Sequence, residues 1–310
     1  MIGAILQSIG GLGLFLLGMS LLTDGLKTLA GSSLQRILRR FTRNPTTGAV
    51  SGAVVTAVVQ SSSATTITAV GLVGAGLLTF PHALGILFGA NIGTTATGWL
   101  VAVFGFKVPL GTIAMPLVLV GVLLRLFASD RLAALGYSLA GFAVIFIAIG
   151  IMQSGMANLE GLVTPESFPG NDLLGRLELV AIGVAITLVT QSSSAGVATA
   201  MTALHTGTIG FEQAAALVIG MDVGTTVTAV LATLGGSAAV KRTGYAHLIY
   251  NLMTGTMAFA LLTPYINVAE LLGSSSDPEL FLVGFHTFFN TLGVLLVLPL
   301  AGRFGRLMER

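Results

Sequence analysis

Two stretches of this chain, 131 positions apart, repeat one another. Residues 56–97 and 187–228 align without a gap and are identical at 17 of 42 positions. The matches include the tetrapeptides Gln60–Ser63 and Gln191–Ser194, and each of these uncharged polar clusters lies inside apolar sequence long enough for a membrane. Because polar groups buried in lipid need partners, the duplication predicts that both clusters bind a ligand and its ions.

The composition places most of the chain outside water. Hydrophobic residues make up 54% of the sequence and charged residues 8%, with a mean hydropathy of +0.94. These values indicate an all-α polytopic membrane protein. The first 19 residues lack the basic segment and the cleavage site of a secretory signal, so we expect them to form a retained span. With no cysteine, thiolate metal sites and thiol nucleophiles are excluded.

A window of about 20 apolar residues per span predicts seven full spans, near 2–24, 82–104, 109–127, 133–153, 212–234, 245–265 and 282–301. Two further apolar blocks, 47–78 and 177–207, are too long for one helix and too short for two crossings. Each has its Gln-Ser-Ser-Ser cluster near the middle, which favours a re-entrant hairpin of two short helices. Non-helical backbone at membrane depth must be covered by protein or line a cavity, so we expect the tips to point inward.

Positive charge segregates under this topology. One set of connections holds only Lys107 and Arg176, and the other holds twelve positive residues: Lys27, Arg36, Arg39, Arg40, Arg43, Arg125, Arg131, Lys241, Arg242, Arg303, Arg306 and Arg310. By the positive-inside rule, the N-terminus is predicted outside and the C-terminus inside a bacterial-type cytoplasmic (inner) membrane.

The span count predicts two repeats of opposite orientation. Residues 1–127 hold a span, a basic interfacial helix within 27–43, the hairpin 47–78 and two spans. Residues 133–265 hold a span, the hairpin 177–207 and two spans, and 282–301 is an extra final helix. Inverted repeats with paired broken elements are typical of secondary transporters.

The tips suit an anion. Helices that begin near Ser61 and Ser192 would present unpaired N–H groups and the positive end of a helix dipole. Glutamine carbonyls and hydroxyls are also oxygen ligands for a small cation. Between Thr46 and Phe106 there is no charged residue, so we expect no fixed cation at the tips and infer that co-bound cations neutralise the anion.

Paired Gln-Ser-Ser-Ser motifs, each followed by a segment like Gly89–Thr95, resemble the type II sodium/phosphate cotransporters and their bacterial relatives over nearly the whole chain. The resemblance implies movement of a substrate domain against a scaffold. It implies a phosphate site lined by Ser62, Ser63, Ser193 and Ser194, to which we add the neighbouring Ser61 and Ser192. It also implies sodium sites and their surroundings formed by Gln60, Gln191, Asn91, Thr94, Thr95, Thr225 and Thr226.

The chain departs from that pattern at Asp222, which aligns with Asn91, and in ending at residue 310, where many bacterial relatives continue into a soluble regulatory domain. An ionisable group at membrane depth is a functional candidate, so Asp222 joins the predicted sodium ligands. The alternative is a neutral or water-exposed hydrogen-bonding group.

Structural explanations compete with these assignments. Serine-rich stretches can serve helix packing, and the rows Gly85, Gly89, Gly93 and Ala216, Gly220, Gly224 favour close packing. Gly93 and Gly224 are also candidates for helix breaks. The pairs His247/Asn251 and His286/Asn290 favour interhelical hydrogen bonds over a proton relay.

No enzyme motif is present. We therefore expect a sodium-coupled importer of inorganic phosphate that works by alternating access, with Na⁺ as the co-transported ion. The alternatives are a cotransporter of another oxyanion such as sulfate, and a passive anion channel. The expected partners are phosphate, sodium and the lipid bilayer, without nucleic acid, and a homo-oligomer is left open.

Overall fold

The computed structural model describes residues 1–107, 110–159, 161–272 and 276–309, and this part of the chain is helical and without β-strands. The helices are α1 (Ile2–Ala30), α2 (Ser33–Phe41), α3 (Pro45–Val59), α4 (Ser62–Gly74), α5 (Phe80–Leu100), the π-helix η1 (Val101–Lys107), α6 (Leu110–Phe127), α7 (Asp130–Ala157), the short 3₁₀ helix η2 (Pro165–Ser167), α8 (Leu173–Thr190), α9 (Ser193–His205), α10 (Phe211–Gly224), α11 (Thr226–Thr233), α12 (Ala238–Leu271), α13 (Pro278–Val297), the 3₁₀ turn η3 (Leu298–Leu300) and α14 (Ala301–Glu309).

Within the described residues, seven helical runs are long and apolar enough to cross a membrane: Ile2–Ala30, Phe80–Lys107, Asp130–Ala157, Leu173–Thr190, Phe211–Thr233, Ala238–Leu271 and Pro278–Met308. The protein is a multi-pass membrane protein. Six of these runs match expected spans. The seventh, α8, was expected as a half-length hairpin limb, but it begins earlier and has 18 residues. The remaining expected span, 109–127, corresponds to α6, and its first residue lies outside the described part.

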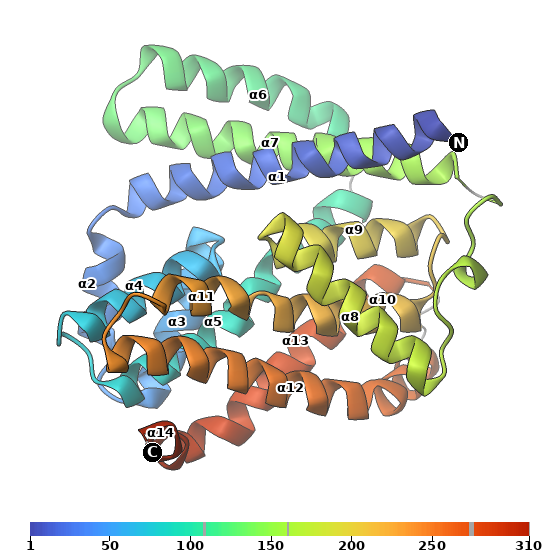
Figure 1. The fold of residues 1–310 in the computed structure, drawn as a ribbon. Coiled ribbons are helices and arrows are strands. Elements are labelled where there is room, and N and C mark those ends of the chain that lie inside the picture. The colour runs from blue at the N-terminus through green and yellow to red at the C-terminus, as the bar shows by residue number, and fades with distance from the viewer. Residues whose placement is uncertain (108–109, 160, 273–275, 310) are drawn as a thin grey trace.

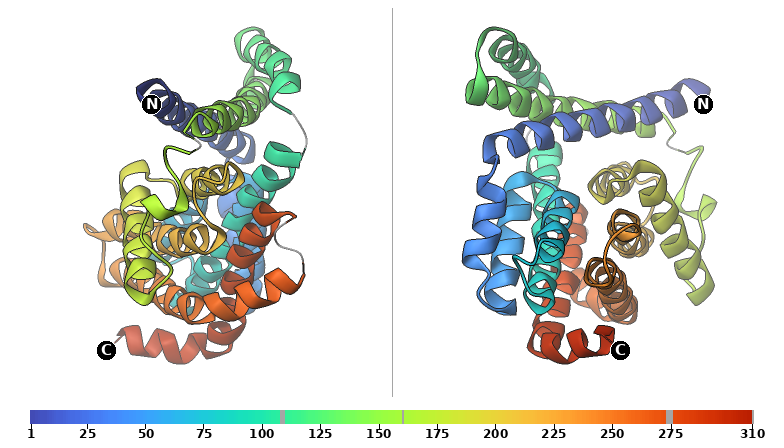
Figure 2. Two further views of the ribbon diagram at one scale, coloured as in Figure 1. Left: turned by 90° about the vertical axis from the view of Figure 1, so that its right-hand side faces the viewer. Right: turned by 60° about the vertical axis from the view of Figure 1, so that its left-hand side comes forward.

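Three long helices form a layer of their own. α1, α6 and α7 pack together along one side of the molecule, and the other helices lie on the opposite side of α1 and α7 (Figures 1 and 2). Glycines bring α1 and α7 into close contact. A Cβ at Gly18 would lie 2.9 Å from the Gly141 carbonyl oxygen, and one at Gly25 would lie 2.7 Å from that of Ala134. The layer therefore depends on backbone-to-backbone packing.

Glycine rows also bring α5 close to α3 and α10 close to α8. A Cβ at Gly85 would lie 2.0 Å from the Pro45 carbonyl oxygen of α3. In the second half, a Cβ at Gly220 would lie 2.0 Å from the Val180 carbonyl oxygen of α8. The packing role predicted for these rows is confirmed, and it sets α5 beside α3 and α10 beside α8.

The glycine–threonine segments differ in helical continuity. α10 ends at Gly224 and α11 begins at Thr226, but Thr225 between them keeps right-handed helical angles and donates its N–H to the Met221 carbonyl oxygen, so the expected break is only a local irregularity within one helical run. The break expected at Gly93 is wrong, because α5 is continuous from Phe80 to Leu100 and changes to π-helix at Val101. Gly93 is needed for packing instead, since a Cβ there would lie 2.4 Å from the Ala53 carbonyl oxygen of α3.

Candidate functional site

Both Gln-Ser-Ser-Ser clusters form the same turn between two helices. Gln60 directly follows the end of α3 and Gln191 directly follows the end of α8, and both glutamines adopt the left-handed conformation, with φ of 56° and 52°. The following serines, Ser61 and Ser192, are extended and cap the next helices, α4 and α9. Ser61 Oγ accepts a hydrogen bond from Ala64 N–H at 3.2 Å, and Ser192 Oγ accepts one from Ala195 N–H at 3.2 Å. Each turn thus ends one helix and opens another with a serine cap.

Left-handed backbone is costly for a residue with a side chain, by about 1–3 kcal/mol. The structure holds both glutamines in place through their side-chain amides. Gln60 Oε1 accepts a hydrogen bond from Thr97 Oγ1 at 2.9 Å, and Gln191 Oε1 accepts one from Thr228 Oγ1 at 2.9 Å. Strained backbone that is held this way is characteristic of functional sites.

The two turns line one cavity. Its volume is about 380 Å³, and all six predicted substrate serines line it, together with Gln60, Gln191, Thr94 and Thr225 of the predicted sodium set. The remaining lining residues are Leu16, Met19, Ser20, Thr23, Asp24, Lys27, Thr97, Thr187, Thr190 and Thr228. Segments 131 positions apart in the sequence therefore contribute to a single polar chamber.

Four of the six serines have hydroxyls available to a ligand. In the described structure, the hydroxyls of Ser62, Ser63, Ser193 and Ser194 form no hydrogen bond with another residue. They lie in the first turns of α4 and α9, where backbone N–H groups lack helical acceptors and the helix dipole is positive. Hydroxyls and helix N-termini converging from two sides suit a small oxyanion.

Thr97 and Thr228 are site residues that the sequence reasoning missed. They are identical at the last aligned position of the duplicated segments, so a signal was present in the alignment. Their hydroxyls hold the glutamine side chains and they also line the cavity. Thr187 and Thr190 on α8 are further lining residues without a predicted role.

The expectation that no fixed cation reaches the tips is wrong. Lys27 and Asp24, both on α1, line the cavity, and Lys27 Nζ lies 3.7 Å from Asp24 Oδ1. The residues near the tips in the sequence are uncharged, but α1 runs to Ala30 and approaches the first turn from a distant part of the chain. Thr23 Oγ1 donates a hydrogen bond to the Gln60 carbonyl oxygen at 3.4 Å.

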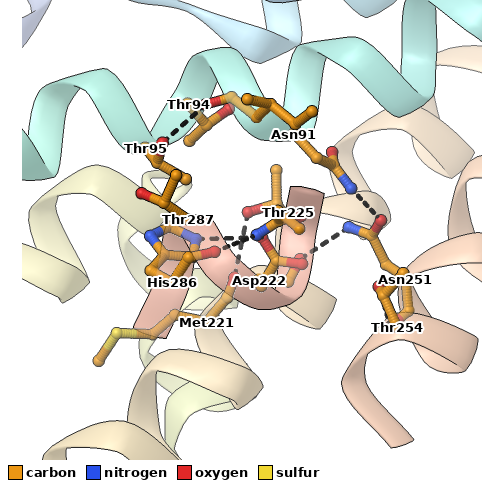
Figure 3. A network of polar contacts seen from close by, with 12 residues as sticks. Asn91, Thr94, Thr95, Met221, Asp222, Thr225, Asn251, Thr254, His286 and Thr287 are labelled. Atoms are coloured by element: carbon orange, nitrogen blue, oxygen red, sulfur yellow. Dashed lines mark hydrogen bonds and ion pairs between the residues drawn. The ribbon is translucent and has the colours of Figure 1, made fainter. Parts of the chain in front are cut away.

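The other predicted sodium ligands do not line the cavity. Asn91 and Asp222 belong to a buried polar network (Figure 3). Thr95 and Thr226 instead donate hydrogen bonds to the nearby Ile92 and Val223 carbonyl oxygens. Asn91, Thr95, Asp222 and Thr226 are all at most 5% exposed. Asn251 joins the two aligned positions, because its Oδ1 accepts a hydrogen bond from Asn91 Nδ2 and its Nδ2 donates to the Asp222 carbonyl oxygen at 3.0 Å. The network therefore connects the two halves of the duplication.

The carboxylate of Asp222 is only partly satisfied. Its Oδ1 lies 3.3 Å from His286 Nε2 and 3.4 Å from Asn290 Nδ2, whereas its buried Oδ2 has no hydrogen-bond partner. The Oδ1 atom of Asn290 is also buried without a partner. Unpaired buried oxygens are costly in a protein interior, and they are the atoms that a small hard cation binds.

The histidine–asparagine pairs make the interhelical contacts predicted for them. His247 Nε2 lies 3.1 Å from Asn91 Oδ1 and so links α12 to α5. His286 and Asn290 link α13 to α10 through Asp222. The threonines near this network donate back to their own helices: Thr94 to the Ala90 carbonyl oxygen at 2.9 Å, and Thr225 to that of Met221 at 3.1 Å. Their oxygens keep lone pairs for another ligand.

Comparison with known proteins decides the family. The family model described as Na+/Pi-cotransporter matches residues 14–154 and 173–293. The chain belongs to this family. The resemblance inferred from the paired motifs is therefore confirmed, and the Na+/Pi-cotransporter family consists of transporters, not enzymes.

Relatives in the family carry different names. The chain is 33% identical over 300 residues to "Uncharacterized protein YqeW" of Bacillus subtilis (strain 168), covering 95% of this chain and 94% of that protein. It is 28% identical over 302 residues to "Putative inorganic phosphate export protein YjbB" of Escherichia coli (strain K12), covering 95% of this chain and 53% of the relative. The chain thus spans about half the length of YjbB.

A third relative is the human "Sodium-dependent phosphate transport protein 2B". The chain is 35% identical to it over 103 residues, which cover 33% of this chain and 15% of the human protein. No solved structure matches the chain.

Proposed function

We propose that this protein of the Na+/Pi-cotransporter family is a sodium-coupled carrier that imports inorganic phosphate by alternating access. The observation that carries the proposal is the single cavity lined by both Gln-Ser-Ser-Ser turns. A volume of about 380 Å³ accommodates a tetrahedral oxyanion together with ions and water. The four free serine hydroxyls and the N-termini of α4 and α9 supply the donors that such an anion requires.

The cavity provides no net charge to hold the anion. Lys27 and Asp24 are the charged residues that line it within the described structure, and their charges cancel. Phosphate therefore needs additional positive charge, which co-bound sodium would supply. The ligands we assign to sodium are the oxygens of Gln60, Gln191, Thr94 and Thr225 at the cavity, and those of the buried residues Asn91, Thr95, Asp222 and Thr226.

The proposed architecture has two inverted repeats, 1–127 and 133–265, whose hairpins enter the membrane from opposite sides, followed by the final helix 282–301. The matched left-handed turns at Gln60 and Gln191 support it. The distribution of positive residues supports an outside N-terminus and an inside C-terminus in the cytoplasmic membrane. The layer of α1, α6 and α7 supports a scaffold against which the remaining helices move.

The direct test is uptake of radiolabelled phosphate into proteoliposomes that contain the purified full chain. An inward sodium gradient should drive phosphate accumulation inside the vesicles. Uptake that persists when choline replaces sodium would indicate a passive channel, and stronger transport of sulfate would indicate another oxyanion.

Direction is the second arm of that test, because the YjbB relatives are named for phosphate export. In a sodium symporter both solutes move the same way, so reversing the sodium gradient must reverse the phosphate flux. If phosphate leaves preloaded vesicles while sodium flows inward, the proposal of import is wrong and the protein exports phosphate.

A further inference from the structure

α1 contributes a charged wall to the cavity that neither duplicated segment contains. The residues Leu16, Met19, Ser20, Thr23, Asp24 and Lys27 line the cavity from this helix. Their spacing of three and four positions places them along one face of α1. Two of them are charged, and no other charged residue of the described chain lines the cavity.

The position of this wall is fixed by packing. Gly18 and Gly25 leave no room for a side chain against the Gly141 and Ala134 carbonyl oxygens of α7, so α1 lies at close range on α7. On the cavity side, the hydrogen bond from Thr23 Oγ1 to the Gln60 carbonyl oxygen ties α1 to the first turn. Asp24 and Lys27 follow directly after this contact.

The ion pair itself is loose and exposed. Lys27 Nζ and Asp24 Oδ1 are 3.7 Å apart, and the side chains are 42% and 57% exposed. Ser20 Oγ donates to Asp24 Oδ2 at 3.4 Å. Solvent-exposed ion pairs at such distances contribute little to stability. Each charged group can therefore bind a ligand in the cavity instead of its partner.

We propose that Lys27 binds the oxyanion and that Asp24 selects phosphate over sulfate by accepting a hydrogen bond from a protonated phosphate oxygen. The inference rests on the proposed function and concerns the substrate specificity of that site. At neutral pH phosphate retains at least one P–OH group, whereas sulfate has no proton to donate. Asp24 would therefore accept a hydrogen bond from phosphate and repel an unprotonated sulfate oxygen.

The test measures equilibrium binding of radiolabelled phosphate to the purified full chain in detergent with sodium, and its competition by sulfate. Lys27→Met should weaken phosphate binding about tenfold or more, because a hydrogen bond to a charged group is lost. Asp24→Asn should leave phosphate binding within about threefold of wild type, while sulfate competes about tenfold better, since the repulsion between two negative charges is removed.

Lys107 and Asp277 offer a matched control pair. Their charged atoms are 2.8 Å apart, their side chains are 43% and 44% exposed, and they do not line the cavity. Lys107→Met and Asp277→Asn should bind phosphate and reject sulfate as the wild type does. Lys27→Arg, which keeps the positive charge, should restore much of the phosphate binding lost in Lys27→Met and thereby separate loss of charge from misfolding.

The outcomes separate the two proposals. Wild-type protein that binds no phosphate in sodium overturns the proposed function and this inference together. Wild-type protein that binds phosphate, with Lys27→Met and Asp24→Asn indistinguishable from the control variants, overturns the role of the ion pair alone. Increased competition by sulfate in Asp277→Asn as well as in Asp24→Asn would also reject a specific role for Asp24.

Discussion

At the scale of single residues, the structure separates the serines of each tetrapeptide into two roles. Ser61 and Ser192 hold the first turns of α4 and α9 through their side-chain oxygens. Ser62, Ser63, Ser193 and Ser194 line the cavity, and their hydroxyls make no hydrogen bond with another residue of the described structure. The sequence treats all six alike, because capping and ligand binding use the same residue type.

Replacing one of the four free serines by alanine should weaken phosphate binding. The loss of one hydrogen bond to a charged ligand costs roughly 1.5–3 kcal/mol, which is about tenfold or more in affinity. Equilibrium binding to Ser63→Ala and Ser194→Ala measures the effect. Ser154→Ala on α7 is the control, since its hydroxyl donates to the Gly150 carbonyl oxygen outside the cavity. Wild-type affinity in the variant that lacks all four hydroxyls would show that these serines do not bind phosphate.

Asp222 aligns with the neutral Asn91, so the two halves of the duplication differ in charge at this buried position. We expect Asp222→Asn to transport phosphate but to require more sodium, because the unpaired Oδ2 carboxylate oxygen is replaced by a neutral amide group. The sodium concentration for half-maximal uptake in proteoliposomes is the measurement. Asp277→Asn serves as the surface control. An unchanged sodium dependence in Asp222→Asn would assign the carboxylate a hydrogen-bonding role only, toward His286 and Asn290.

At the scale of helices, glycine rows determine how closely α5 packs against α3 and how closely α10 packs against α8. A Cβ at Gly89 would lie 1.8 Å from the Ala49 carbonyl oxygen of α3, and backbone cannot yield as a flexible side chain does. Gly89→Ala should therefore destabilise the protein by about 1–3 kcal/mol, the usual cost of overpacking. Thermal unfolding in detergent should show a lower midpoint temperature.

Gly71 in α4 provides the comparison for Gly89. It has open space where a Cβ would be added, so Gly71→Ala should be neutral or slightly stabilising through helix propensity. Equal midpoints for Gly71→Ala and Gly89→Ala would mean that α3 and α5 are not in close contact.

Much of the helical organisation could be predicted from the sequence because apolar length and duplicated motifs are local signals. These local signals predict that helices end beside Gln60 and Gln191. They also predict the close packing at the glycine rows. The wall from α1 could not be predicted, because a window of about 20 residues ends the first span before Lys27, whereas α1 continues to Ala30. Its contact with the first turn is a tertiary contact between segments that share no motif.

At the scale of the whole molecule, the cavity is lined both by α1, which belongs to the layer of α1, α6 and α7, and by the two turns from the remaining helices. A site lined by two packing units changes whenever those units shift relative to one another. In the proposed transport cycle, phosphate and sodium would therefore bind between the parts of the protein that move.

The absence of net fixed charge in the cavity leads to a prediction about the complete protein. The Lys27–Asp24 pair sums to zero, so sodium bound near the turns should raise phosphate affinity. By linkage, phosphate must then raise sodium affinity by the same factor, for which about 5–150-fold is typical of coupled sites. Titrations of each solute at several fixed concentrations of the other measure both factors, with choline maintaining ionic strength. Phosphate affinity that is equal in sodium and in choline would mean that the hydroxyls, helix N-termini and Lys27 hold the anion without a cation, and coupling would then have to arise in the movement of the helices rather than in binding.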